Sequence, residues 1–181
     1  FNTQDILEFA KQLDYKPQVN SLWIPESWGR EAFVMLGAIG AMTRRLILGT
    51  SIVSMFSRSP ATLAMAASTL DNITLNRTII GIGASTPILA EDWHGIKFIH
   101  PLDRMREYVT CFKIISSGET INFDGNFFKL KNIKIMHPSQ RREIPVFLGA
   151  VNPGMIKLAT EIANGIILYL SPLDELKKTV E

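Results

Sequence analysis

The chain has 181 residues, of which 46% are hydrophobic and 20% are charged. These proportions are typical of one folded domain with a sizeable core and argue against a disordered protein. The 19 basic and 17 acidic residues leave a net charge of +2, and the basic residues are scattered or paired. The absence of a basic stripe in the sequence argues against nucleic-acid binding.

Cys111 is the only cysteine of the sequence, so no internal disulfide can form. Its position in an apolar helical pattern predicts a buried, reduced thiol, and we expect a cytoplasmic protein. The longest apolar run, Ala32 to Met42, is too short to cross a bilayer, so no membrane partner is expected.

Helical and strand patterns alternate along the chain, which predicts repeated βα units and a parallel sheet. In chain order, the first half is predicted to contain helix 3–14, strand 21–25, helix 30–43, strand 45–53, helix 60–73 and strand 78–84. The second half is predicted to contain helix 102–117, a hairpin, strand 145–150, helix 153–163, strand 165–170 and a last helix from about Pro172. The alternation around Asp124-Gly125 predicts the hairpin, an antiparallel insertion at about 119–136.

Five parallel strands are compatible with two architectures. A doubly wound sheet needs no further strand, whereas a (β/α)₈ barrel needs eight strands and typically about 250 residues, so a barrel of this length would be incomplete. The runs around Ile79-Ile80 and Ile166-Ile167-Leu168 are apolar on both faces, as in buried parallel strands. Composition and pattern alone leave both architectures open.

Polar residues stand where two of the predicted strands end. Ser21-Leu-Trp-Ile-Pro-Glu26 and Arg45-Leu-Ile-Leu-Gly-Thr-Ser-Ile-Val53 are apolar runs with polar residues at or near their carboxyl ends. Ligands of parallel α/β folds bind at that end, so Glu26, Thr50 and Ser51 are candidate site residues. Glu26 fits equally well as a loop carboxylate that caps the next helix.

Two glycine-containing strand ends are further candidates. The first is Gly81-Ile-Gly83-Ala84-Ser85, whose glycines would either expose backbone to a phosphate or ring, or let another segment approach closely. The segment lacks the glycine spacing of dinucleotide-binding motifs, and no helix is predicted directly after it. Gly149-Ala150 precedes a helix that begins near Pro153, which fits an anion site or a plain βα turn.

Several loop side chains complete the candidate set. Arg58 precedes a predicted helix and fits either a phosphate ligand or a solvated surface arginine. Trp28 and Trp93-His94 are predicted to lie in loops after strands, where they would line a pocket or serve as ordinary loop residues. His100 and His137 both precede prolines and lack neighbouring ligands at metal-binding spacing, so no metal site is predicted.

Nine segments together resemble one known family. They are Trp23-Ile-Pro-Glu-Ser-Trp-Gly-Arg30, Leu48-Gly-Thr-Ser-Ile-Val53, Ser57-Arg-Ser-Pro60, Ala64-Met-Ala-Ala67, Thr69-Leu-Asp71, Ile80-Gly-Ile-Gly-Ala-Ser85, Trp93-His-Gly95, Pro101-Leu-Asp-Arg-Met-Arg-Glu-Tyr108 and Ile144-Pro-Val-Phe-Leu-Gly-Ala150. In order and over nearly the whole chain, they resemble the bacterial luciferase-like monooxygenase superfamily. The narrower likeness is to its oxidoreductases that use the deazaflavin coenzyme F420, relatives of methylenetetrahydromethanopterin reductase.

This resemblance implies a (β/α)₈ barrel with a hairpin insertion, of which residues 1–181 form a single, partial domain. By that comparison the chain carries strands 2 to 6 and lacks the first strand and everything after the start of the sixth helix. We therefore expect a fragment that is poorly stable alone or associates, and a homo-oligomer, a dimer or higher.

The resemblance also implies a cofactor site. The cofactor ring would lie over Thr50, Ser51 and Ile52, with a non-prolyl cis peptide between Ser51 and Ile52. Backbone at Gly81, Gly83 and Ala84 would border the ring. N–H groups of Gly149 and Ala150 would bind the phosphate tail.

The resemblance places a proton-transfer histidine after the strand-end acid in many relatives, but here that position is Ser27. Glu26 is therefore the candidate acid or base, and Trp28 the candidate pocket wall. The implied reaction is hydride transfer between F420 and an organic small-molecule substrate. An FMN-dependent monooxygenase and a non-catalytic remnant that binds a flavin or a partner are the alternatives.

Overall fold

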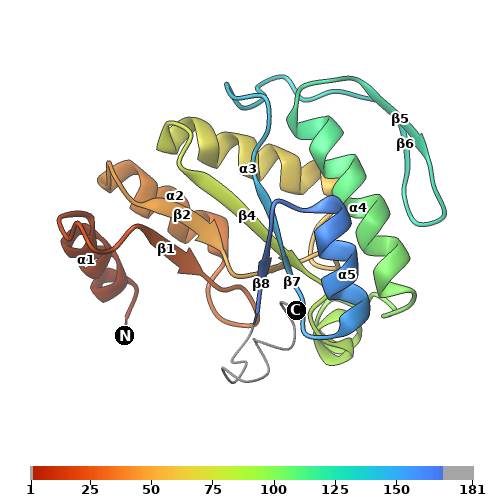
Figure 1. Cartoon of the computed structure of the whole chain (residues 1–181), viewed down its shortest axis with the longest axis horizontal. Helices are drawn as coiled ribbons and strands as arrows, with labels where there is room; N and C mark the ends of the chain where they lie inside the picture. Colours follow the sequence, from red (N-terminus) through yellow and green to blue (C-terminus); the bar gives the residue numbers. More distant parts are fainter. Residues whose placement is uncertain (1, 169–181) are drawn as a thin grey trace.

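The computed structural model describes residues 2–168, which form one curled parallel sheet with helices along its outer face (Figure 1). The strands of this sheet are β1 (Ser21–Ile24), β2 (Ile47–Thr50), β3 (Val53–Ser54), β4 (Thr78–Gly83), β7 (Val146–Gly149) and β8 (Gly165–Ile167). They lie in the order β1-β2-β4-β7-β8, and the short β3 pairs with β4 beside this path. Spatial order thus follows chain order.

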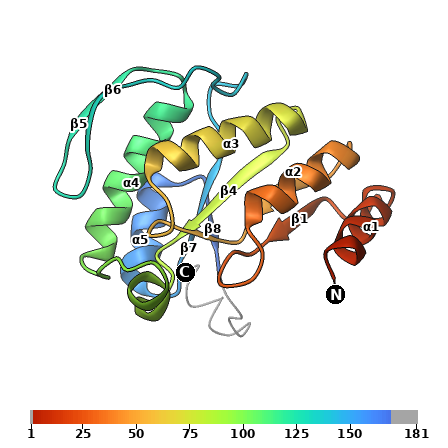
Figure 2. The same ribbon diagram turned by 180° about the vertical axis from the view of Figure 1, so that it is seen from behind.

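The helices are α1 (Thr3–Asp14), α2 (Ala32–Met42), α3 (Pro60–Thr74), α4 (Pro101–Ser116) and α5 (Pro153–Ile162). Figures 1 and 2 show α2 to α5 following the outer side of the sheet, while α1 lies beyond β1. Helices on a single face and strands in chain order are features of a barrel wall. A doubly wound sheet would have helices on both faces and reverse its strand order, so this alternative is wrong.

Local sequence explains where the helices begin. The Asn2 side chain accepts a hydrogen bond from the Asp5 backbone N–H and forms a capping box. The side chains of Ser59 and Asn152 accept from the third residue of α3 and α5, each of which starts with proline. These caps place the predicted helix starts within one or two residues of the observed ones.

The inner face of the sheet carries aromatic rings over glycines. The rings of Trp23 in β1 and Phe147 in β7 lie 5.8 Å apart between centroids, although β2 and β4 separate their strands. A Cβ on Gly49 would lie 2.3 Å from the Trp23 ring, so the glycine leaves room for the indole. Two non-adjacent strands therefore approach each other across the concave face, as the curvature of a barrel requires.

A buried ion pair ties the amino ends of the strands to the outer helices. Asp71 in α3 is fully buried and accepts hydrogen bonds from Nε and Nη2 of Arg141 at 3.0 and 2.7 Å. The same guanidinium contacts the Thr78 carbonyl at the start of β4. Because this end of a barrel usually serves stability, we assign the pair a structural role.

The hairpin predicted at Asp124-Gly125 is confirmed. Strands β5 (Ile121–Asp124) and β6 (Lys129–Ile133) pair antiparallel and extend along α4 (Figure 1). No helix among residues 2–168 is long and apolar enough to cross a membrane.

Three predictions about local structure need correction, and one lies outside the described residues. The strand predicted at 45–53 is interrupted after Thr50 and resumes as β3. Residues 87–93 after β4 are helical and include the π-helical segment η1 (Leu89–Trp93), so Trp93 is not a loop residue. The strand predicted at 165–170 ends at Ile167, and the helix predicted from about Pro172 lies outside residues 2–168.

Candidate functional site

The break between β2 and β3 forms the centre of the candidate site. The Ser51-Ile52 peptide bond is cis, which confirms the predicted position and geometry. The Ser51 N–H donates to the carbonyl of Ile24 at 2.9 Å, and the Glu26 N–H donates to the carbonyl of Ile52 at 3.2 Å. The backbone at the end of β1 is thereby fixed to the break.

The hydroxyl of Thr50 joins β2 to β4. It donates to the Gly81 carbonyl at 2.8 Å and accepts from the Gly81 N–H at 2.8 Å, and Thr50 is fully buried. A Cβ on Gly81 would lie 2.0 Å from the Thr50 carbonyl oxygen. The glycine at this position therefore serves the close approach of two strands, the alternative left open from the sequence.

Ile52 fills the space above the other strand-end glycines. A Cβ on Gly83 would lie 2.7 Å from the Ile52 side chain, and a Cβ on Gly149 would lie 3.0 Å from it. The start of β3 and the ends of β4 and β7 thus meet at one aliphatic side chain. The structure brings the predicted residues Ser51, Ile52, Gly83 and Gly149 together at one end of the sheet.

The proposed phosphate-binding turn after β7 is partly occupied by protein contacts. The Ala150 N–H donates to the Ile167 carbonyl at 3.1 Å, so it does not face a ligand as expected. Asn152 caps α5 by accepting from Met155 N–H at 2.9 Å, and Pro153 has no N–H. The prediction of a phosphate contact is therefore wrong for Ala150 and stays a prediction for Gly149.

Glu26 binds an arginine at the carboxyl end of the sheet. Its Oε1 lies 2.9 Å from Nη1 of Arg58, and its Oε2 accepts from Nη2 at 3.0 Å. The two side chains are only 12% and 13% exposed. Oε2 also accepts from the N–H of Ala32, the first residue of α2, at 3.0 Å. The capping alternative for Glu26 is therefore confirmed, while its part in proton transfer stays a prediction.

Arg58 was expected to be either a phosphate ligand or a solvated surface arginine. Both interpretations are wrong, because its side chain is largely buried and paired within the protein. It pairs with Glu31 at 2.8 Å in addition to Glu26, and its guanidinium lies 5.1 Å from the ring centroid of Phe33. The buried Tyr108 hydroxyl donates to the Arg58 carbonyl at 3.1 Å, and burial raises the pKa of Tyr108. Sequence reasoning missed this network because its hydrogen-bonded members are separated by 27 to 50 residues.

The predicted aromatic pocket residues do not form one wall in this structure. Trp28 lies in the loop after β1 and is 67% exposed, and Trp93 in η1 is 60% exposed. His94 follows η1 directly. Both indoles lie on connections that leave the carboxyl ends of strands, but no ring contact joins them among the described residues.

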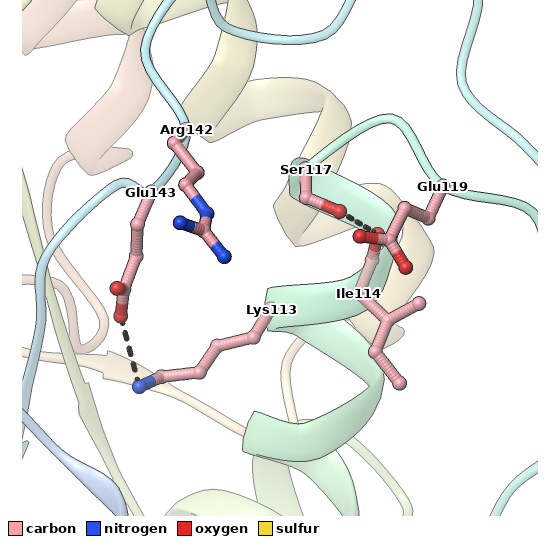
Figure 3. A pocket seen from close by; sticks show the side chains of 6 residues that line it. All are labelled: Lys113, Ile114, Ser117, Glu119, Arg142 and Glu143. Atoms are coloured by element: carbon pink, nitrogen blue, oxygen red, sulfur yellow. Dashed lines mark hydrogen bonds and ion pairs between the residues drawn. The ribbon is translucent and has the colours of Figure 1, made fainter.

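A hollow of about 290 Å³ lies at the opposite, amino end of the sheet (Figure 3). It is lined by the end of α4 and the segment before β7, where Lys113 Nζ binds Glu143 Oε1 at 3.0 Å. This hydrogen bond lowers the pKa of Glu143. Because barrel ligands bind at the carboxyl ends of strands, we do not assign the hollow to the candidate site.

Comparisons with known proteins agree with the fold. A family model described as luciferase-like monooxygenase matches residues 2–181. A Mycobacterium tuberculosis protein named a coenzyme F420-dependent oxidoreductase is 35% identical over 167 residues, which cover 84% of this chain and 48% of that protein. The 5,10-methylenetetrahydromethanopterin reductase of Archaeoglobus fulgidus is 31% identical over 91% of this chain and 49% of its own length.

A solved structure extends the likeness to the backbone. The coenzyme F420-dependent tetrahydromethanopterin reductase of Methanopyrus kandleri superposes with a TM-score of 0.91, at 23% identity, over 99% of this chain and 56% of that one. The chain thus spans about half the length of the proteins that it matches.

Proposed function

The chain belongs to the luciferase-like monooxygenase family, and on that premise we propose that it is an oxidoreductase that transfers a hydride between coenzyme F420 and an organic small molecule. The observation that carries the proposal is the 35% identity, over 84% of this chain, with a protein named for F420-dependent oxidoreduction. Residues 1–181 would be part of a single barrel domain, with residues 119–136 as an insertion.

The residues at the carboxyl end of the sheet fit the face of a planar ring. Ile52 occupies the space that a side chain at Gly83 or Gly149 would need, so the strand ends present a small aliphatic surface. The hydroxyls of Ser51 and Ser85 make no hydrogen bond within residues 2–168. Such a surface with a few free polar groups around it is typical of cofactor sites.

Six of the predicted cofactor residues have distinct parts in this proposal. Thr50 and Gly81 hold β2 and β4 together, and Ile52, Gly83 and Ala84 would hold the ring. Gly149 would hold the phosphate tail. When bound, the deazaflavin supplies or accepts the hydride, and the protein provides orientation and a proton path.

Glu26 is the proposed proton-transfer group and Trp28 the proposed pocket wall. Glu26 is fixed at the strand end through its own N–H to Ile52 and through its side chain to Arg58. We assign this carboxylate the part of a base that takes a proton from the substrate as the hydride leaves. Glu26 would then act in the direction of substrate oxidation.

Cofactor titration tests the proposal and separates it from its alternatives. The purified chain is titrated in parallel with F420 and FMN, and binding is followed by the fluorescence of each cofactor. Saturable binding of F420 in preference to FMN is expected. A preference for FMN would favour the monooxygenase, and binding of neither cofactor would favour the non-catalytic remnant.

The proposal includes a cytoplasmic location and a homo-oligomer. The location is supported by the single cysteine, whose buried thiol has a pKa raised by burial to about 11.

A further inference from the structure

Arg104 in α4 lies among three aromatic rings. Its Cζ is 5.1 Å from the ring centroid of Phe56 and 5.3 Å from those of both Phe127 and Phe128. Its Nε is buried and has no hydrogen-bond partner among residues 2–168. The guanidinium is thus held largely by ring faces, an arrangement in which cation–π attraction is strongest because the charge is partly desolvated.

Two of these rings belong to the hairpin turn, and the same helix fixes that turn. The Glu107 carboxylate accepts hydrogen bonds from the N–H groups of Asn126, Phe127 and Phe128 at 2.8, 2.9 and 3.2 Å. Partial burial opposes this effect, but the three donors lower the pKa of Glu107. A Cβ on Gly125 would lie 2.3 Å from Glu107 Oε2, so the turn closes tightly on the carboxylate.

The third ring belongs to the loop that leads from β3 to α3. Phe56 is 2% exposed, its N–H donates to the Ser54 hydroxyl at 3.1 Å, and its ring lies 5.2 Å from that of Phe98. Two residues further, this loop carries Arg58, the partner of Glu26. Arg104 therefore bridges the hairpin turn and the loop of the candidate site.

A second path joins the same two segments. The Tyr108 ring packs edge-on against Phe128 with centroids 5.6 Å apart, and its hydroxyl donates to the Arg58 carbonyl at 3.1 Å. Arg104 and Tyr108 are four residues apart in α4 and lie on one helix face. One helix face thus fixes both the hairpin turn and the arginine that binds Glu26.

We propose that the hairpin insertion is a brace for the candidate site, in which Arg104 is the positioning residue that couples the hairpin turn to the loop of residues 55–59. The brace holds Arg58, and through it Glu26, at the strand end. The contacts described above support the coupling of the two segments. The role of this coupling in catalysis rests on the proposed function. Arg104 acts through Phe56 and Arg58, without contact with a ligand.

Hydrogen exchange followed by mass spectrometry tests the brace without any cofactor. Arg104→Met keeps the aliphatic stem and removes the charge, whereas Arg104→Lys keeps a cation among the rings. Lys129→Ala is the matched control, because it removes an exposed ion pair with Asp124 in the same hairpin. Phe127→Leu tests the same coupling from the hairpin side, should the Met variant fold poorly.

We expect Arg104→Met and Phe127→Leu to speed exchange in residues 55–59 by about tenfold, the order of a lost desolvated cation–π contact. Exchange in the sheet strands should stay unchanged, Arg104→Lys should restore most of the protection, and Lys129→Ala should have no effect on the loop. Unchanged exchange in the loop, or equal acceleration throughout the chain, would overturn the brace.

F420 titration of the same proteins separates this inference from the proposed function. If the wild-type chain does not bind F420, the proposed function fails while the exchange result still decides the brace. If the wild-type chain binds F420, we expect Arg104→Met to lower turnover while F420 affinity changes little, and Arg104→Lys to restore turnover.

Discussion

Both carboxylate oxygens of Glu26 face the guanidinium of Arg58, at 2.9 and 3.0 Å, in a pair that is nearly nine-tenths buried. The pair links the loop after β1 to the loop after β3, and the same carboxylate caps α2 through Ala32. A single acid thus joins three segments at the carboxyl end of the sheet, which gives its substitution two separable consequences.

Glu26→Gln should lower the free energy of unfolding by about 1–3 kcal/mol, because it leaves a buried guanidinium with one charged partner fewer. If Glu26 takes a proton in the reaction, turnover should fall by about 100-fold or more while F420 affinity changes little. Urea unfolding and steady-state kinetics measure the two effects.

Glu31→Gln is the control for this substitution, because Glu31 binds the same arginine from an exposed position. It should change stability by less than about 1 kcal/mol. Wild-type turnover in Glu26→Gln, or a defect confined to cofactor binding, would exclude Glu26 from proton transfer.

Thr50→Val should destabilise the fold although it preserves shape. Valine leaves both the N–H and the carbonyl of Gly81 without their buried partner, at a cost of about 2–4 kcal/mol. Thr50→Ser retains the hydroxyl and should lose only about 1 kcal/mol for the missing methyl group. Chemical denaturation of the two variants compares them directly, and equal losses would show that the hydroxyl contributes nothing.

Gly81→Ala should be among the most damaging single-methyl additions in the chain. The new Cβ would meet the Thr50 carbonyl oxygen at 2.0 Å, which forces β2 and β4 apart at a cost of about 3 kcal/mol or more. Gly37→Ala in α2 is the control, since nothing lies within 4 Å of its Cβ position, and it should be neutral or stabilise by roughly 0.5–1 kcal/mol. Thermal melts that rank the two variants in the opposite order would refute this account of the strand spacing.

The Cys111 thiol should make stability depend on pH in the alkaline range. Burial raises its pKa from about 9 to about 11, so the folded state disfavours the thiolate. Its contribution is complete below pH 9 and should fall by up to about 2–3 kcal/mol as the pH rises through 11. The difference between wild type and Cys111→Ala in urea unfolding isolates this effect, and parallel pH profiles would contradict it.

The parts of the structure that depend on local pattern were predictable from sequence. Asparagine, serine and proline at helix starts placed α1, α3 and α5, and Asp124-Gly125 placed the hairpin. The resemblance to the family added the cis peptide at Ser51-Ile52, which no propensity predicts. These features depend on neighbours within a few residues or on a known relative.

Contacts between distant segments were not predictable. Gly81 and Gly83 indicated that another segment approaches this strand closely, but the sequence did not identify Thr50 and Ile52 as the residues that approach them. Arg58 carries no local sign that two acids and a ring surround it. The π-helical segment η1 was missed because its five residues are too few to show a periodicity.

The last prediction concerns the concave face and the edge of the sheet. Among residues 2–168, β1 pairs only with β2, and the inner face carries Trp23, Phe147 and Ile167 beside glycines. An open edge and an apolar face recruit other strands, so the 181-residue chain should associate in a concentration-dependent way. Trp23→Gln removes an indole from that face without changing the outer core and should shift the equilibrium toward monomer. Size-exclusion chromatography over a range of concentrations measures the association of the wild-type chain and its change in Trp23→Gln. A wild-type chain that stays monomeric at every concentration and melts cooperatively would show that this face does not recruit a partner.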